Sequence, residues 1–122
     1  MKNFILLFLF SLGFNNCFCQ DSIEIKIEQS DSLSDIGLFN TAERLLLETL
    51  TKSTCLEDSF LLYAQLCGLS KTNNKIQKTA KYGHLALTEK YNSFTKLEPF
   101  GDVLYNLSVA KFRLGEIDST FF

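Results

Sequence analysis

The sequence has 122 residues, 46% of them hydrophobic, which is enough for one small domain with its own core and argues against a disordered chain. Its formal net charge is −2, so it lacks the basic surface expected of a protein whose main partner is nucleic acid. It contains one histidine, His84, which excludes many catalytic and metal sites that need several.

Residues 1–19 have the order of a secretory signal peptide. Lys2 supplies a basic start, Phe4 to Phe14 form an apolar run, and a polar stretch leads to Cys19. As a helix, that run of eleven residues spans about 16 Å, whereas a bilayer core of about 30 Å needs roughly 20 residues. We therefore favour a cleaved signal over a retained membrane anchor. Cleavage after Cys19 leaves residues 20–122 as an exported domain of a bacterial protein, periplasmic or secreted.

Two cysteines, Cys55 and Cys67, remain after that cleavage. On one continuous helix they would lie about 18 Å apart. A disulfide requires Cα atoms within about 7 Å. We therefore expect no bridge between them, with Cys67 as a small buried side chain and Cys55 near a helix start.

Two interpretations are open for residues 22–36. Ile23 to Glu28 alternate between apolar and charged residues, which is typical of a strand. No second convincing strand is available to pair with it, and an isolated strand would expose its backbone groups. The repeat pattern described below favours a helix, which we predict here. A break at Gly37 and Leu38 follows, and residues 40–50 read as an amphipathic helix.

The clearest pattern lies between Leu62 and Leu87. Leu62, Leu66 and Leu69 recur at helical spacing, and a polar turn at residues 72–74 follows. A second apolar stripe comes after the turn: Ile76, Ala80, Gly83 and Leu87. The pattern predicts an antiparallel pair of helices, the first from a capping box at Thr54 and Glu57 to Lys71 and the second to about Tyr91.

One more helix is predicted after a loop at residues 92–98. Phe94 and Leu97 are expected to pack that loop against the domain. Pro99 suits the first turn of a helix, where its missing N–H is not needed, and Gly115 is expected to end the helix. Its predicted buried residues are Val103, Leu107, Ala110 and Leu114.

Three turns share one pattern. Gly37, Asn74 and Gly115 each tolerate the left-handed backbone region. An apolar residue follows two positions later and a small residue three positions after that; the sets are Phe39 and Ala42, Ile76 and Thr79, and Ile117 and Thr120. The apolar residues are 37 and 41 positions apart, counted as 76 − 39 and 117 − 76. A period of this length indicates a helical solenoid.

These residues resemble the tetratricopeptide repeat family, over about residues 23–120 and most closely over Leu62 to Leu87. The resemblance implies an all-α, right-handed solenoid of helical hairpins with about five helices. Its repeats would cover residues 23–53, 54–94 and, incompletely, 95–122. Gln29 at an expected leucine, Cys67 and Thr79 depart from the family pattern, and no proline closes the second repeat.

No catalytic or metal-binding pattern is present in the sequence, and no cofactor is expected. His84 lies within a predicted helix with no nucleophile placed beside it, so we interpret it as a surface or interface residue. Four lysines form a basic stripe near the central turn: Lys71, Lys75, Lys78 and Lys81. A solvated helix face is the simpler reading of the stripe, and a docking patch for an acidic partner or a lipid headgroup is the alternative. The sequon at residues 106–108 is discounted because Leu107 is needed in the core.

In the resembled family, peptides lie on the concave face formed by the first helices of the repeats. The positions implied here are Leu61, Ala64, Gly68, Lys71, Asp102, Tyr105, Val109, Phe112 and Arg113. Among them Lys71 and Arg113 offer positive charge for a carboxylate, Tyr105 and Phe112 offer aromatic anchors, and Asp102 completes the expected partner-binding set.

We therefore expect a non-catalytic, exported scaffold that binds a protein or peptide. The alternative is the N-terminal extracytoplasmic region of a longer sensor kinase or peptidase, because the third repeat lacks its second helix. In either case membrane contact is expected only through export or a missing downstream segment.

Overall fold

The computed structural model describes residues 20–115; the expected signal peptide at 1–19 and the segment 116–122, with Ile117, lie outside the described residues. The described chain is all-helical, which confirms the predicted class and number of helices. In order, the elements are α2 (Gln20–Asp35), α3 (Phe39–Lys52), α4 (Leu56–Thr72), α5 (Ile76–Ala86), a 3-10 helix η1 (Glu89–Phe94) and α6 (Glu98–Arg113).

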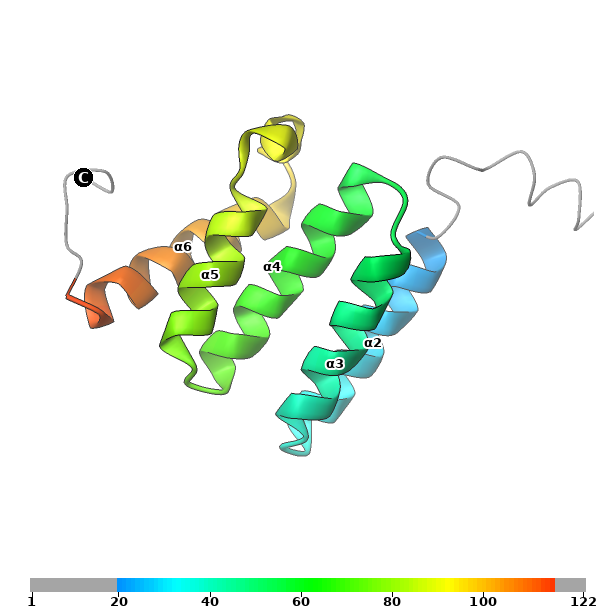
Figure 1. Cartoon of the computed structure of the whole chain (residues 1–122), viewed down its shortest axis with the longest axis horizontal. Coiled ribbons are helices and arrows are strands. Elements are labelled where there is room, and N and C mark those ends of the chain that lie inside the picture. The colour runs from blue at the N-terminus through cyan, green and yellow to red at the C-terminus, as the bar shows by residue number, and fades with distance from the viewer. Residues whose placement is uncertain (1–19, 116–122) are drawn as a thin grey trace, which may run out of the picture.

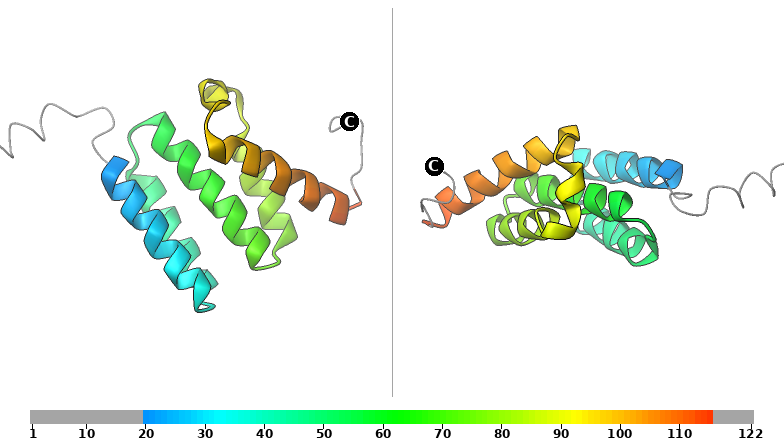
Figure 2. Two further views of the ribbon diagram at one scale, coloured as in Figure 1. Left: turned by 180° about the vertical axis from the view of Figure 1, so that it is seen from behind. Right: turned by 90° about the horizontal axis from the view of Figure 1, so that it is seen from above.

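The helices lie in two layers (Figures 1 and 2). Helices α2, α4 and α6 form one layer, and α3 and α5 form the other. Helix α4 is central, because it packs against α2, α3, α5 and α6. Two helix pairs, α2 with α3 and α4 with α5, are therefore packed side by side, with α6 on the far side of the second pair.

Three left-handed residues mark the helix ends predicted from the sequence. Gly37 has φ +84°, Gly115 has φ +75°, and Asn74, with φ +62°, is the one non-glycine residue with positive φ in residues 20–115. The first two turns also close alike: Leu38 N donates to Leu33 O at 2.9 Å, and Lys75 N donates to Ser70 O at 2.8 Å. These six-to-one bonds are typical of Schellman caps, which satisfy the last carbonyls of a helix.

Residues 20–35 form a helix, so the helical interpretation of this segment is confirmed over the strand. Ile23 and Ser30, seven residues apart, are both buried against the core. Ser30 Oγ donates to the Ile27 carbonyl within the same helix at 2.7 Å. In a strand, Ile23 and Ile25 would lie on the same face. In the helix Ile23 is buried, whereas Ile25 is 53% exposed.

The core has two clusters. One joins α2, α3, α4 and α5 around Leu46, Leu62 and Leu66, all fully buried. The other lies where α4, η1 and α6 meet. Its centre is Phe60, whose ring stacks on Phe94 at 5.5 Å and lies 6.0 Å from the ring of Tyr91. Phe94 and Leu97 pack on this second cluster, which confirms their predicted role in the loop before α6.

Helix α5 is shorter than predicted. It ends at Ala86 rather than near Tyr91, and the chain turns into η1, which brings Tyr91, 2% exposed, against the second cluster. The burial of this aromatic ring stabilises the shorter helix and the turn that follows it. The buried face of α5 also differs from the predicted stripe. The buried residues are Thr79, Tyr82, Gly83 and Ala86, of which only Gly83 belongs to the predicted stripe.

Two details at helix ends are also corrected. Helix α4 begins at Leu56 with Cys55 as its N-cap and no side-chain cap hydrogen bond, so the capping box predicted at Thr54 is wrong. Leu114 is 37% exposed, because it follows the last turn of α6 as its C-cap. The other three predicted core residues of α6 are buried: Val103, Leu107 and Ala110.

Cys67 is buried, as predicted, and its thiol lies 3.4 Å from the carbonyl oxygen of Thr79 on α5. Burial raises the pKa of this thiol to about 11, so it stays protonated at neutral pH. No disulfide joins it to Cys55. Among residues 20–115, no helix is both long and apolar enough to cross a membrane.

Candidate binding groove

A groove of about 450 Å³ runs between the three helices of one layer, α2, α4 and α6. Six of the nine residues implied by the family resemblance line it: Leu61, Ala64, Gly68, Lys71, Asp102 and Tyr105. The other three, Val109, Phe112 and Arg113, lie on α6 but outside the groove lining. The structure therefore brings most of the expected concave-face residues together around one depression.

The groove is open because α4 presents small side chains to it. Ala64 and Gly68 are one helical turn apart and leave space between α4 and α6. A Cβ added at Gly68 would meet Asn106 Nδ2 at 3.8 Å, an ordinary contact. The glycine thus widens the groove without being required by a close approach of backbones. Ile27 of α2 and Leu61 of α4 add apolar surface to the lining.

Lys71 and Tyr105 form a pair across one end of the groove. Lys71 Nζ lies 4.4 Å from the centroid of the Tyr105 ring, within the range of a cation–π interaction. Tyr105 is 62% exposed, so much of its side chain remains accessible to a ligand. The pair fixes a positive charge and an aromatic surface at the same place.

Arg113 and Phe112 lie beyond this end of the groove. Arg113 Nη1 donates to Asn74 Oδ1 at 3.2 Å, which ties the end of α6 to the turn between α4 and α5. Phe112 is 67% exposed. Lys71 and Arg113 therefore engage different groups of the chain, the ring of Tyr105 and the side chain of Asn74.

Four groove residues were missed by sequence reasoning: Ile27, Gln65, Pro99 and Asn106. Gln65 and Asn106 are 41 positions apart, counted as 106 − 65, which is the spacing that relates α4 to α6. That spacing was available in the sequence. Gln65 Nε2 donates to Ser30 Oγ at 3.1 Å and to Asp31 Oδ1 at 2.6 Å, so it joins α4 to α2 along the groove wall.

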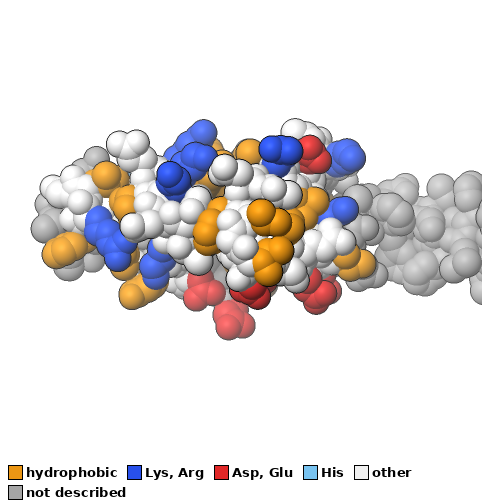
Figure 3. All heavy atoms as spheres, turned by 90° about the horizontal axis from the view of Figure 1, so that it is seen from below, with side chains coloured by type: hydrophobic (Ala, Val, Ile, Leu, Met, Phe, Trp, Pro, Cys, Tyr) orange, Lys and Arg blue, Asp and Glu red, His pale blue; other side chains and the backbone are white. Residues whose placement is uncertain are grey.

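Charge is distributed unevenly between the two layers. Figure 3 looks at the end where the α2–α3 and α4–α5 turns lie, and most acidic side chains gather along the edge on the α2 side. Many lysine and arginine side chains lie along the opposite edge, and others lie at the left end of this view. Helix α2 carries four exposed acids, Glu24, Glu28, Asp31 and Asp35, against one lysine, Lys26. Among its described side chains, only the apolar Ile27 belongs to the groove lining.

The basic stripe predicted around the central turn lies mainly on the other layer. Lys78 Nζ pairs with Glu43 Oε1 at 2.9 Å, and Lys81 Nζ lies 5.6 Å from the centroid of the Tyr82 ring. Both lysines are exposed, as on a solvated helix face. His84 is also exposed, in the middle of α5. Within residues 20–115 no three His, Cys, Asp or Glu side chains are close enough together to hold a metal ion.

Comparisons with protein-family models, with curated proteins and with solved structures found no match to this chain.

Proposed function

We propose that this protein is an exported, non-catalytic scaffold whose groove between α2, α4 and α6 binds an extended segment of a partner protein. In this proposal the helix pairs form a right-handed solenoid like that of the tetratricopeptide repeat family, with the groove on its concave side. Export rests on the sequence of residues 1–19, and peptide binding rests on the groove.

Matching burial at the repeat spacings supports the solenoid. Leu62 and Val103, 41 positions apart, are both fully buried, and Leu66 and Leu107, at the same spacing, are at most 2% exposed. Ala42 and Thr79, 37 positions apart, are small and fully buried. They occupy the same place after the left-handed turn residues, where two helices approach closely.

The observation that carries the proposed binding is the groove lining. It combines an apolar floor with amide groups and one aromatic–cation pair, the mixture that fixes a ligand by shape and by a few polar contacts. Gln65 donates its Nε2 hydrogens to Ser30 and Asp31 and so offers a peptide its carbonyl oxygen as an acceptor. The amide of Asn106 contains both a donor and an acceptor, so together the two amides suit the backbone of an extended peptide. From Leu61 to Lys71 the groove follows ten residues of helix, about 15 Å, the length of four to five extended residues.

The test is selection of ligands by the full chain. Peptides from a random display library are selected against it, and the affinities of the best are measured by fluorescence anisotropy. Gly68→Leu fills the floor, and Tyr105→Ala removes the aromatic surface. We expect each variant to weaken the selected peptides by tenfold or more, as for residues at the centre of an interface.

Lys96→Ala, an exposed change outside the groove, is the matched control and should bind as the wild type does. Circular dichroism of each variant establishes that the helices remain. Failure to enrich any peptide, or equal binding by wild type and both groove variants, would rule out this site.

A further inference from the structure

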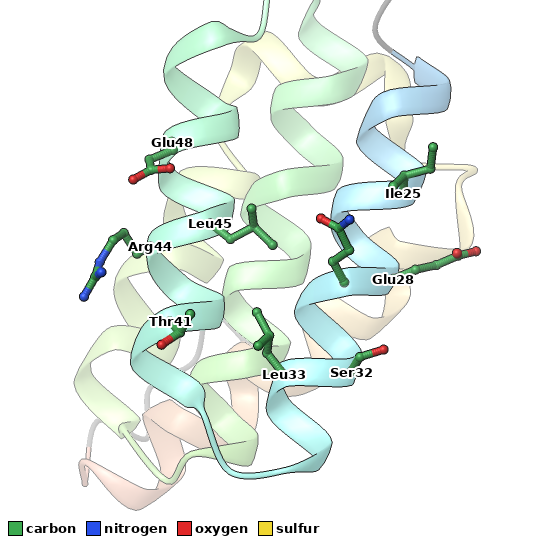
Figure 4. Close-up of a pocket in the computed structure, with 9 residues that line it drawn as sticks. Ile25, Glu28, Ser32, Leu33, Thr41, Arg44, Leu45 and Glu48 are labelled. Atoms are coloured by element: carbon green, nitrogen blue, oxygen red, sulfur yellow. The ribbon is translucent and has the colours of Figure 1, made fainter.

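A second, larger groove lies on the opposite side of the α2–α3 pair from α4. It has a volume of about 740 Å³, and Figure 4 shows it open toward the viewer, with α4, α5 and α6 behind. Ile25, Leu33 and Leu45 give it an apolar centre. Its polar lining residues are Glu28, Gln29, Ser32, Thr41, Arg44 and Glu48. None of these residues belongs to the groove proposed above for peptides.

This face corresponds to one that is already an interface inside the molecule. Adding 37 positions converts Ile25 to Leu62 and Leu45 to Tyr82. In the α4–α5 pair these positions meet the α2–α3 pair: Leu62 is fully buried, and Tyr82 bonds to Glu43. The corresponding face of α2 and α3 has nothing of residues 23–115 packed on it. A face of this kind therefore accepts another pair of helices.

The charges on this face are complementary to themselves. Figure 4 shows Arg44 on the α3 side and Glu28 on the α2 side, at about the same level along the two helices. The described residues give neither of them an ion pair, whereas Lys78 has Glu43. The α3 rim thus carries the positive Arg44, with Glu48 one turn further along the same helix, and the α2 rim carries the negative Glu28, with the apolar residues between the two rims.

We propose that this face binds a second copy of the same chain about a two-fold axis parallel to α2 and α3. That rotation exchanges the two sides of the face and keeps the level along the helices. Arg44 of each copy then meets the partner's Glu28, so the ion pair forms twice. Thr41 comes opposite the partner's Ser32, and the apolar residues meet at the centre. Such an interface is closed and isologous, the commonest form of homodimer.

The size of the face sets the strength of the dimer. Helices of 16 and 14 residues are about 24 and 21 Å long. At a helix spacing of about 10 Å they offer roughly 500 Å² per copy, below the roughly 800 Å² per partner of a stable complex. The association is therefore weak, with Kd on the order of 10–100 μM.

The experiment is sedimentation equilibrium of the full chain at concentrations from about 5 to 500 μM, which span the expected Kd. Wild type should change from monomer to dimer over this range. Arg44→Glu places two acids opposite each other, and Glu28→Arg places two bases opposite each other. Each single variant should therefore associate at least tenfold more weakly than wild type.

An equimolar mixture of the two single variants provides the decisive arm. In the mixed dimer the substituted position 44 of one variant would face the substituted position 28 of the other, so that an acid again meets a base. The native Glu28 and Arg44 would face each other at the second contact. The mixture should recover wild-type affinity. Lys75→Glu, an exposed charge reversal away from this face, should dimerise as wild type does.

Each outcome bears on the proposal. Residues 1–19 are identical in every variant, so association through them would not respond to Arg44 or Glu28. A wild type that stays monomeric up to the highest concentration, single variants that dimerise as well as wild type, or a mixture that stays monomeric would each overturn it. The unchanged circular dichroism of all variants separates loss of association from loss of fold.

Discussion

Tyr82 Oη donates a hydrogen bond of 2.7 Å to Glu43 Oε2, across the boundary between the two helix pairs. Lys78 Nζ binds the other oxygen of the same carboxylate at 2.9 Å. Burial acts to raise the pKa of Glu43, but the two hydrogen bonds and the charges of Lys78 and Lys81 outweigh it, so the pKa is lowered. One carboxylate on α3 therefore binds two residues of α5, the exposed Lys78 and the buried Tyr82.

Glu43→Gln should destabilise the fold by about 1–2 kcal/mol at neutral pH, because it weakens a charge-assisted hydrogen bond and removes an ion pair. The loss is measured by urea unfolding followed by circular dichroism. Since the folded pKa is lower than the unfolded one, near 4.5, the stabilisation is fully present above that value. It disappears as the pH falls through the folded pKa, where the two proteins should converge.

Glu48→Gln is the control for Glu43, since Glu48 is on the same helix and exposed. It should change stability by less than about 0.5 kcal/mol. A double-mutant cycle of Glu43→Gln with Tyr82→Phe should show coupling, because the two side chains share one bond. Additive effects would mean that the contact does not join the helix pairs in solution.

Asp58 is a buried acid in the first turn of α4. It is 1% exposed, and neither carboxylate oxygen has a hydrogen-bond partner within the described residues. Burial raises the pKa of Asp58, and the nearby Cys55 side chain offsets part of this effect. Because the folded pKa is higher than the unfolded one, ionisation of Asp58 costs stability above the folded pKa.

Asp58→Asn should therefore stabilise the fold at neutral pH by about 1 kcal/mol, since an uncharged amide is less costly to bury and this gain outweighs the loss of a negative charge from the first turn of α4. The gain should shrink as the pH falls toward the unfolded value of 3.8, where Asp58 takes up a proton in both states. Urea unfolding at several pH values measures this.

Glu57→Asn removes a less buried acid from the same turn. It should lower stability slightly, because a negative charge there interacts favourably with the helix dipole. A loss of stability with Asp58→Asn at every pH would contradict the argument.

The turns were predictable because their chemistry is local. Gly37, Asn74 and Gly115 were found from residue type and spacing, and each has a positive φ. The end of α5 was not predictable, because Tyr91 leaves the helical course to pack against Phe60, which is 31 positions earlier in the sequence. Local helix signals cannot include that contact.

The groove was partly predictable from the family resemblance and the repeat spacing. The repeat spacing relates positions on α4 and α6, and six of the expected residues line the groove. Ile27 comes from α2, where Gln29 obscured the register, so its place could be seen only once α2 was packed against α4. The burial of Asp58 also lies beyond sequence reasoning, because acidic residues in a first helical turn are normally exposed.

Close packing of α5 against α6 should require glycine at position 83, whereas position 101 should accept a larger residue. A Cβ at Gly83 would lie 3.2 Å from both Cβ and Cδ1 of Leu107 and 3.4 Å from Cys67 Sγ. The Cβ of Leu107 cannot move away without shifting α6. Gly83→Ala should therefore destabilise the fold by about 1–2 kcal/mol, despite a gain of up to about 1 kcal/mol in helix propensity.

Gly101→Ala is the matched control, because a Cβ there meets nothing within 4 Å. It should stabilise the protein by about 0.5–1 kcal/mol through helix propensity alone. Thermal and urea unfolding compare the two variants. Leu107→Ala combined with Gly83→Ala should cost less than the sum of the single changes, since alanine lacks Cδ1 and so removes one of the two close contacts, although its Cβ keeps the other. Equal effects at both glycines would show that α5 and α6 are less closely packed than this.

Asn74 should tolerate glycine better than alanine. Its φ of +62° is a conformation that asparagine and glycine adopt and that a Cβ without a local hydrogen bond disfavours. Asn74→Ala should cost about 1–2 kcal/mol, whereas Asn74→Gly should change stability by less than about 0.5 kcal/mol.

Asn73, with φ −78°, is the control, and Asn73→Ala should resemble Asn74→Gly in effect. Arg113→Ala removes only the exposed bond to Asn74 Oδ1, so it should be near neutral as well. If Asn74→Ala and Asn74→Gly were equally destabilising, the Arg113 bond rather than the backbone conformation would be what Asn74 contributes.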